Sequence, residues 1–388
     1  MAYDFDAVID RRGTDSLKYD FAREEGKRPG LLPMWVADMD FAAPPEVLAD
    51  LRKSVDHGVF GYTEPKGDSY YDAVAGWFGG RFGYHVGRDE IVKAPGLVFA
   101  ISQAVRAFTE PGDAVLIQTP AYYPFYDIVR GNGRELAVNP LPYAGGKYGI
   151  DFGDFERKIA GRGVKLFILC SPHNPVGRVW TRDELGRMRD ICAGRGVAVV
   201  SDEIHCDFAW PGHAHTCYGL LDENAVVATG PSKTFNLAGL QISNILVKNP
   251  DLRAKLVAEF ARSGCHQMNT MGLAACRSAY AKGAPWLGEL RAYILGNIRL
   301  LREFLEAELP NVRLVEPEGT YLAWLDFSAY GLSQGELDRR VEEGAGLWLD
   351  SGTLFGPEGA GFQRVNLACP RATLAEALGR LKKEFAPG

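Results

Sequence analysis

Residues 164–177 read VKLFILCSPHNPVG, an almost continuously apolar segment that runs directly into a polar turn. The part from Val164 to Cys170 lacks the alternation of apolar and polar residues that a half-exposed strand shows, so it is typical of a strand covered on both faces. Such strands occur in parallel sheets that carry helices on both sides. We therefore expect a central strand of an α/β domain, with Asn174 just beyond its carboxyl end.

The same arrangement extends to both sides of this segment, where short apolar runs alternate with helical stretches. Strands are expected at residues 114–117, 136–138, 197–200, 225–228 and 245–247. Helices are expected at residues 44–57, 69–82, 98–108, 124–130 and 154–160, and another opens at Thr181, where Glu184 completes a capping box. Strands separated by helices of this length predict a mostly parallel sheet with both faces covered.

The pattern changes near residue 286, where a long helix begins that reaches about residue 309. Two expected strands follow at 312–315 and 321–327, and then helices near 334–343 and 373–385. We divide the chain accordingly into an N-terminal segment that packs with the small domain, a large domain and a smaller α+β C-terminal domain. The expected bounds of these three parts are residues 1–43, 44–285 and 286–388.

The composition narrows the class of protein. The chain has 388 residues, of which 46% are hydrophobic and 24% charged, as in a full-size globular enzyme. A net charge of -6 argues against nucleic acid or an acidic membrane surface as a partner. No run is long enough to span a membrane, and the opening residues MAYDFD do not resemble a signal peptide. The seven cysteines are scattered and never spaced Cys-x-x-Cys, which is typical of reduced thiols in the cytoplasm.

Polar residues follow three of the expected strands. Asn174 comes after the strand that ends at Cys170, Asp202 after residues 197–200, and Lys233 after residues 225–228. Because ligands bind at the carboxyl ends of parallel strands, we expect these side chains to surround one site. Taken singly, Asn174 could be part of a turn, Asp202 a cap and Lys233 a solvated turn lysine; the three together in this order favour a shared site.

These residue types suit pyridoxal 5'-phosphate (PLP). A lysine amine captures an aldehyde, and the hydroxyl groups of Thr229 and Ser232 beside it can bind a phosphate. The carboxylate of Asp202 can keep a pyridine nitrogen protonated, so that the ring draws electrons from a substrate's α-carbon. Asn174 can donate a hydrogen bond to the ring's phenolate oxygen. Lys233 would also act as a general base once a substrate amine displaces it.

Several motifs together carry a family resemblance: Asn174-Pro175-x-Gly177, Asp202-x-x-His205, Ser232-Lys233, and Arg364 within residues 362–366. Over nearly its whole length the chain resembles the fold-type I PLP enzymes of the class I/II aminotransferase superfamily. The resemblance implies a mostly parallel sheet of the seven-stranded type in the large domain. It also implies that Arg364 binds the α-carboxylate of an amino-acid substrate, a planar group that suits a bidentate arginine.

The resemblance extends to the remaining contacts of the cofactor. These would come from side chains on its ring and from groups around its phosphate, namely Tyr122, His205, Thr229, Ser232 and the helix-opening residues Gly96, Leu97 and Val98, whose N–H groups suit an anion. Tyr62 looks like the tyrosine that reaches the phosphate of a neighbouring subunit. That role implies a homodimer with shared active sites.

Three details resemble one branch of the superfamily, the MalY/PatB group of cystathionine β-lyases, also called cysteine-S-conjugate β-lyases. Gln241 stands where many aminotransferases of the superfamily have a phosphate-binding arginine. His205 replaces the usual tyrosine, and residues 32–41 read LPMWVADMDF. In this group Ala37 would lie near the substrate carboxylate. The implied reaction is α,β-elimination, in which a thiolate leaves the β-carbon and pyruvate and ammonia remain.

Other functions stay open at this point. An aminotransferase shares the first steps, a specialised-metabolism enzyme could act on a large S-conjugate, and a regulatory binding role could exist in addition. No second arginine clearly awaits a distal carboxylate, so the substrate's side chain is not fixed. His213 and His215 are spaced as a metal pair, but no cluster of acidic residues or cysteines accompanies them, and we expect no metal.

Overall fold

The computed structural model describes residues 3–161 and 163–386. Its centre is a seven-stranded sheet with the strand order β2-β10-β9-β8-β7-β3-β4. The strands are β2 (Ile91–Ala94), β3 (Ala114–Thr119), β4 (Glu135–Pro140), β7 (Val164–Cys170), β8 (Ala198–Asp202), β9 (Val226–Thr229) and β10 (Ser243–Leu246). β10 is antiparallel to both of its neighbours and the other pairs are parallel, so the sheet is mostly parallel, as the sequence predicts.

Helices cover both faces of this sheet, which explains why its strands are apolar without alternation. The helices that pack on it include α4 (Leu97–Phe108), α5 (Pro124–Gly131), α6 (Phe152–Gly161), α7 (Arg182–Ala193) and α9 (Pro250–Arg262). Leu166 and Ile168 of β7 join the core with α4, α5 and α9, whereas Phe167 and Leu169 join the core with α6 and α7. All four side chains are at most 1% exposed, and each contributes roughly 1.5–3 kcal/mol by its burial.

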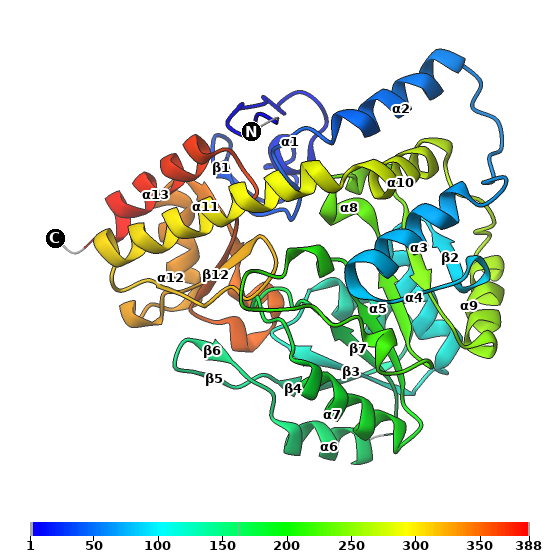
Figure 1. Ribbon diagram of the computed structural model, residues 1–388. Helices are drawn as coiled ribbons and strands as arrows, with labels where there is room; N and C mark the ends of the chain where they lie inside the picture. The colour runs from blue at the N-terminus through cyan, green and yellow to red at the C-terminus, as the bar shows by residue number, and fades with distance from the viewer. Residues whose placement is uncertain (1–2, 162, 387–388) are drawn as a thin grey trace.

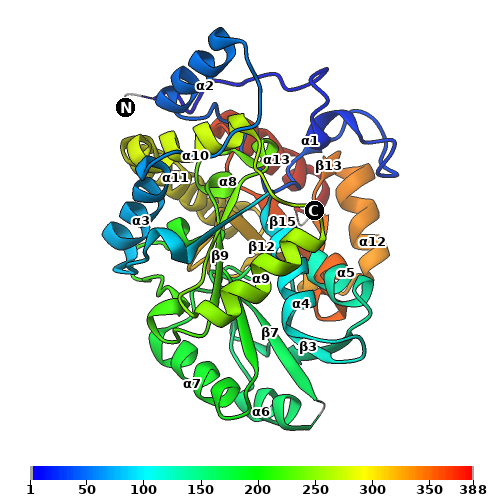
Figure 2. The same cartoon turned by 90° about the vertical axis from the view of Figure 1, so that its right-hand side faces the viewer.

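Three further helices are α2 (Pro45–His57), α3 (Ser69–Phe82) and α10 (Thr270–Lys282), and α10 contacts α8 (Pro231–Thr234), the short helix that carries Lys233. α10 packs against both α2 and α3. In the two views α2 lies at the outer edge of the molecule, away from the seven-stranded sheet (Figures 1 and 2). A two-stranded hairpin is formed by β5 (Tyr143–Ala144) and β6 (Lys147–Tyr148).

The C-terminal part of the chain is built on a four-stranded antiparallel sheet of order β11-β12-β15-β14. Its elements are α11 (Ala284–Glu308), β11 (Arg313–Leu314), β12 (Leu322–Asp326), α12 (Gln334–Arg339), β13 (Leu347–Trp348), β14 (Asp350–Ser351), β15 (Phe362–Asn366) and α13 (Arg371–Phe385). The N-terminal segment contains α1 (Leu17–Asp20) and β1 (Leu32–Pro33), and β1 pairs in parallel with β13. Residues from the two ends of the chain therefore lie side by side (Figure 1).

Some elements differ from the sequence prediction. The pattern does not predict β2, α9 or α10; β2 is a short edge strand whose apolar run is interrupted by Lys93. Lys233 lies in a one-turn helix instead of the expected polar turn, because Pro231 fixes the first helical φ and needs no hydrogen bond there. The expected helix near residues 334–343 is α-helical to Arg339 and then widens into a π-turn.

The cysteines and His215 make ordinary contacts within the protein. All seven cysteines are free, and only Cys265 among them is partly exposed. His215 is buried against Glu203, with 2.8 Å between Nε2 and Oε2. In the described part of the chain, no group of three or more His, Cys, Asp and Glu residues could hold a metal ion. Within the same residues, no helix combines the length and the apolar character needed to cross a membrane.

Candidate active site

The carboxyl ends of three adjacent strands stand level with one another. Cys170 of β7 pairs with Asp202 of β8, and Asp202 pairs with Ala228 of β9. The chain then leaves each strand at the same edge of the sheet, and Asn174, Asp202 and Lys233 all line one cavity there. The register of the sheet thus brings together the three residues that the sequence places after separate strands.

Lys233 is held on a stiff turn. α8 begins with Pro231 after Gly230, and it ends before Asn236, whose φ of 57° lies in the left-handed region that asparagine tolerates. The Asn236 side chain accepts a hydrogen bond from Met39 N at 3.0 Å and donates two, to Met39 O at 2.9 Å and Phe41 O at 2.8 Å. Asn236 therefore fixes the N-terminal segment across the lysine-bearing turn.

This attachment brings a backbone carbonyl to the lysine. Lys233 Nζ donates a hydrogen bond to Ala37 O at 2.7 Å, and the Tyr321 hydroxyl donates to the same oxygen at 3.0 Å. From β15, Asn366 Nδ2 donates to Val36 O at 2.6 Å and also to Asp38 O. The segment around Ala37 is thereby held by the lysine turn and by β15, and its carbonyl accepts a hydrogen bond from the amine.

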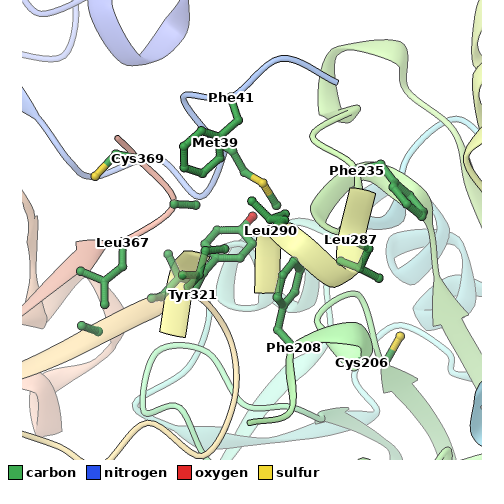
Figure 3. Close-up of a cluster of buried hydrophobic side chains, with 14 of the residues drawn as sticks. Met39, Phe41, Cys206, Phe208, Phe235, Leu287, Leu290, Tyr321, Leu367 and Cys369 are labelled. Atoms are coloured by element: carbon green, nitrogen blue, oxygen red, sulfur yellow. The ribbon is translucent and has the colours of Figure 1, made fainter. Parts of the chain in front are cut away.

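Behind this segment lies a buried apolar cluster (Figure 3). It gathers side chains from segments that lie far apart in the sequence: Met39, Phe41, Cys206, Phe208, Phe235, Leu287, Leu290, Tyr321, Leu367 and Cys369. Tyr321 packs its ring edge-on against Phe208, with 5.0 Å between the ring centroids. The cluster therefore holds in place the tyrosine whose hydroxyl contacts Ala37.

Arg364 lies on β15 and is buried, with 2% of its surface exposed. Its guanidinium donates hydrogen bonds to Asn174 Oδ1 at 2.9 Å and Trp35 O at 3.0 Å, and it forms an ion pair with Asp350. Arg364 Nε is buried without a hydrogen-bond partner. An arginine that is anchored by a carboxylate and contacts a cavity-lining amide suits a planar carboxylate ligand.

The cavity encloses about 330 Å³. Its walls come from the N-terminal segment, the start of α4 and the ends of β7, β8 and β9, and its described lining is Ala37, Pro95, Gly96, Leu97, Val98, Phe99, Ile101, Tyr122, Cys170, Asn174, Asp202, Ile204, His205, Ser232, Lys233, Ala238, Gln241, Ile242 and Ser243. A volume of this order is typical of a site for a small organic molecule.

Burial moves the pKa values of both charged groups in the cavity toward neutrality. The pKa of Lys233 falls to about 8, chiefly because burial disfavours its charged form, while Asp38 opposes the fall and Arg364 adds to it. Burial likewise raises the pKa of Asp202 to about 7, although the N–H of Ile204 donates to its Oδ1 at 3.1 Å. Perturbed groups that share a cleft indicate a functional site.

His205 and Tyr122 form polar parts of the wall. His205 is 2% exposed, its Nδ1 has no hydrogen-bond partner, and burial holds its pKa well below the usual range, so the ring is neutral. Burial raises the pKa of Tyr122, which packs edge-on against Phe125 with 5.6 Å between the ring centroids. Both rings therefore border the cavity as uncharged groups.

The start of α4 forms the other end of the cavity. Gly96 has a φ of 97°, which side-chain-bearing residues rarely adopt, and a Cβ there would lie 2.8 Å from Gln241 Oε1. Glycine thus keeps open a cradle in front of the first N–H groups of α4, which have no partner within the helix. Leu97 and Val98, which follow, both line the cavity. A helix N-terminus of this kind suits a phosphate.

Together these features fit PLP. The buried amine of Lys233 can capture its aldehyde, Asp202 can face its ring nitrogen, and the cradle at Gly96 can take its phosphate. The unpartnered His205 Nδ1 and Arg364 Nε add polar atoms that the protein itself does not satisfy.

Three of the predicted residues do not line the cavity. Arg364 is joined to it through its hydrogen bond to Asn174. Thr229 is 1% exposed, and its hydroxyl interacts with the Cys206 thiol and the Tyr280 hydroxyl. Its predicted contact with the cofactor stays a prediction. Tyr62 is 96% exposed and lines a separate surface hollow. Its predicted role requires a second chain and stays a prediction.

Two residues that contact the site, Asp350 and Tyr321, are not identified by the sequence pattern. Asp350 pairs directly with Arg364 across β14 and β15, but β14 has only two residues and gives no clear strand pattern. Tyr321 begins a strand that the sequence does predict, yet nothing local indicates that its hydroxyl contacts Ala37. Predicting strand pairing between residues 350 and 364 could have found the first; the second depends on packing.

Residues 31–381 match the family described as aminotransferase class I and II. A curated relative, the cystathionine β-lyase PatB from Bacillus subtilis (strain 168), is 47% identical over 382 residues, which cover 97% of this chain and 98% of that protein. The similarity therefore extends over both of the expected domains and the N-terminal segment.

Solved structures with the same fold are also similar in sequence. A PLP-bound putative aminotransferase from Clostridium difficile 630 gives a TM-score of 0.96 at 38% identity and covers 99% of this chain and 100% of that chain. Cystalysin from Treponema denticola, whose structure contains a PLP cofactor, gives a TM-score of 0.95 at 37% identity and covers 99% of each chain.

Proposed function

The chain belongs to the class I and II aminotransferase family, and from this we propose that it is a PLP-dependent carbon–sulfur β-lyase. It cleaves cystathionine or another cysteine S-conjugate, and with water the products are a thiol, pyruvate and ammonia. The observation that carries the proposal is that Lys233, Asp202 and Asn174 line one cavity and that Arg364 donates a hydrogen bond to Asn174, in a chain 47% identical to a cystathionine β-lyase.

Residues around the cavity would hold the cofactor by three kinds of contact. Lys233 would take its aldehyde, Asp202 its pyridine nitrogen and Asn174 its phenolate oxygen. Tyr122 and His205 would contact its ring, and Ser232 and the N–H groups of residues 96–98 would bind its phosphate. When bound, PLP supplies an electron sink for the substrate's α-carbon.

The substrate's α-carboxylate binds to Arg364. Asn174 and Asp350 hold that guanidinium in place, and Asn174 Oδ1 lies 2.9 Å from it. Ala37 lines the cavity, its carbonyl oxygen lies 2.7 Å from Lys233 Nζ, and it would limit the room beside the α-carbon. Two-point binding of this kind fixes the orientation of the α-proton before it is removed.

Lys233 moves the α-proton. Its pKa of about 8 leaves a useful fraction of neutral amine near neutral pH, and the Ala37 carbonyl accepts one of its hydrogens and orients the lone pair. Elimination follows when the thiolate leaves the β-carbon. In an aminotransferase the lysine returns the proton to a different carbon, so the two activities differ in where Lys233 delivers the proton.

An assay without any oxo acid separates these two activities. L-cystathionine is added to the purified protein, and pyruvate and free thiol are followed over time. Steady production of both supports the lyase. A single partial turnover that continues only after 2-oxoglutarate is added would instead identify an aminotransferase. A panel of cysteine S-conjugates in the same assay ranks the substrates.

The protein is proposed to act as a homodimer. Apolar side chains lie exposed along α2 and the segment after it, with exposed fractions of 56% for Val55, 68% for Val59, 59% for Phe60 and 96% for Tyr62. Such a patch suits a second copy of the chain. Tyr62 of each subunit then completes the phosphate end of its neighbour's cavity, where Gln241 provides no positive charge.

Mixing two inactive variants tests this arrangement. Tyr62→Ala and Lys233→Ala are each unable to form a complete site, but a hybrid dimer has one site with both residues intact. Activity that reappears on mixing supports shared sites. A monomeric mass in solution, or no recovery from dimers that exchange subunits, contradicts the proposal.

A further inference from the structure

A buried carboxylate that does not line the cavity is hydrogen-bonded to the lysine-bearing turn. Asp207 belongs to the short 3-10 helix Cys206–Phe208 that follows the loop after β8, and it is 2% exposed. The Thr234 hydroxyl donates a hydrogen bond to its Oδ2 at 2.8 Å. Thr234 follows Lys233 directly in the chain and is 1% exposed.

Two side chains of α3 complete the coordination of this carboxylate. Arg81 Nε donates to Asp207 Oδ1 at 2.8 Å, and Trp77 Nε1 donates to Oδ2 at 3.3 Å. The guanidinium of Arg81 also stacks over the Trp77 ring, with 4.7 Å between its Cζ and the ring centroid. The Asp207 carboxylate thus accepts three hydrogen bonds, one of them from the cation Arg81, and is satisfied. Hydrogen bonds to a charged group are stronger than those between neutral groups.

Asp207 thereby joins two loops that carry different parts of the site. Its 3-10 helix directly follows the segment from Asp202, the last residue of β8, to His205, and its partner Thr234 lies on the lysine turn. The backbone of Cys206 is fixed in turn by its N–H bond to Glu203 O at 3.0 Å. The side chains of Phe208 and Phe235, one residue beyond each end of the hydrogen bond, lie in the apolar cluster of Figure 3. The carboxylate is therefore the polar link within an otherwise apolar junction.

We propose that Asp207 is a positioning residue, which through Thr234 sets the spacing between Lys233 and the Asp202–His205 loop. Asp207 is not among the residues that line the cavity, and its side chain is bound by Thr234, Arg81 and Trp77. The inference rests on the proposed function, because the spacing matters only if Lys233 and Asp202 hold opposite ends of one cofactor.

The expected consequence of loosening this link concerns the amine. Lys233 has a lowered pKa because it is buried, and the charged groups that face it are Asp38, Arg364 and Asp202, with the neutral His205 beside them. If α8 shifts toward solvent, the amine regains water and its pKa rises toward the ordinary value of 10.5. Less neutral amine is then available at a given pH.

The test removes the hydroxyl and keeps the shape. Thr234→Val replaces the oxygen by a methyl group, and Thr234→Ser restores it. Thr109→Val is the matched control: Thr109 is 4% exposed, donates to Val105 O at 2.5 Å and accepts from Arg134 Nε at 2.8 Å, but it lies at the far end of α4. Each holoenzyme is assayed for retention of the visible PLP absorbance during dialysis, for kcat and KM, and for the pH profile of kcat.

We expect Thr234→Val to release cofactor about tenfold faster and to lower kcat about tenfold, with the rising limb of the pH profile moved upward. KM should change less than about threefold, because Arg364 is untouched. Thr234→Ser should recover most of the loss, and Thr109→Val should leave the release rate and pH profile as in the unaltered protein even where it lowers the melting temperature.

Arg81→Met approaches the same carboxylate from its partly exposed side and covers the case in which Thr234→Val does not fold. It should cause the same changes to a smaller extent. If both soluble variants keep the release rate and pH profile of the unaltered protein, the positioning role is wrong. If the unaltered protein itself binds no PLP, or Lys233→Ala retains covalent cofactor, the proposed function fails instead.

Discussion

Two groups of charged side chains differ in whether protein atoms alone satisfy them. One surrounds Arg178 and Glu318, and the other surrounds the cavity. Arg178 donates to Glu318 at 2.8 Å, to both oxygens of Glu184 at 3.0 Å and to Tyr148 O, and Glu318 also meets Lys147 at 2.7 Å. Burial opposes ionisation of Glu318, yet the Lys147 and Arg178 contacts hold its pKa below the usual range. This group is complete within the protein.

The cavity group is incomplete by the same criteria. Lys233 and Asp202 both have pKa values displaced toward their neutral forms, and Arg364 and His205 each keep a buried nitrogen without a partner. The first group therefore stabilises the fold, whereas the second leaves polar atoms available to bind ligands. Substitutions should accordingly change stability in one place and catalysis in the other.

The largest effect on stability is expected at the complete group. Arg178→Met leaves Glu318 and Glu184 buried or half-buried without their shared cation, so the free energy of unfolding should fall by about 3 kcal/mol. Chemical denaturation measures this. The control is Arg157→Met, which removes a 3.4 Å pair whose arginine is 70% exposed and should cost less than about 0.5 kcal/mol. Equal losses in the two variants would remove the contrast.

The largest effect on catalysis is expected at the incomplete group. Arg364→Lys keeps the positive charge beside Asp350 but loses the planar fork, so kcat/KM should fall about 100-fold, mainly through a higher KM. Steady-state kinetics across substrate concentration measure it, with the exposed Arg302→Lys as control. An unchanged KM would mean that Arg364 does not bind the substrate.

A smaller effect concerns the stability lost when the buried carboxyl of Asp202 ionises in the cofactor-free protein. The pKa of Asp202 is about 7 in the folded protein, compared with its ordinary value of 3.8. Ionisation therefore destabilises the folded state progressively as the pH rises from 3.8 to 7, and the full loss is reached above pH 7. Asp202→Asn cannot ionise. Its stability advantage should therefore be greater at pH 8.5 than at pH 5.5 by about 2 kcal/mol, measured by denaturant unfolding. An advantage independent of pH would show that burial does not perturb this carboxyl.

Much of this arrangement could be predicted from the sequence, for reasons visible at particular residues. The run from Leu166 to Cys170 is buried on both faces, and its continuous apolar pattern predicts an interior strand of a sheet covered by helices. Asn174, Asp202 and Lys233 meet because parallel strands end at one edge. Local sequence pattern and strand topology determine these features, so they can be predicted without knowledge of the tertiary contacts.

Other features depend on contacts that a linear pattern does not contain. Thr229 ends the expected strand but does not line the cavity, and Asp350 meets Arg364 through a two-residue strand. Asp207 reaches Thr234 only because both loops pack on one core. The role predicted for Tyr62 requires a second chain. Tertiary packing decides each of these, which is why the sequence leaves them open.

The claim that the cavity group is completed by a cofactor held on Lys233 can be measured directly. Borohydride is added to the purified holoprotein, the protein is digested, and the peptide that carries the reduced pyridoxyl group is identified by mass spectrometry. We predict one label, on Lys233, and none in the Lys233→Ala variant. A label on a different lysine, or a labelled Lys233→Ala protein, would contradict the account.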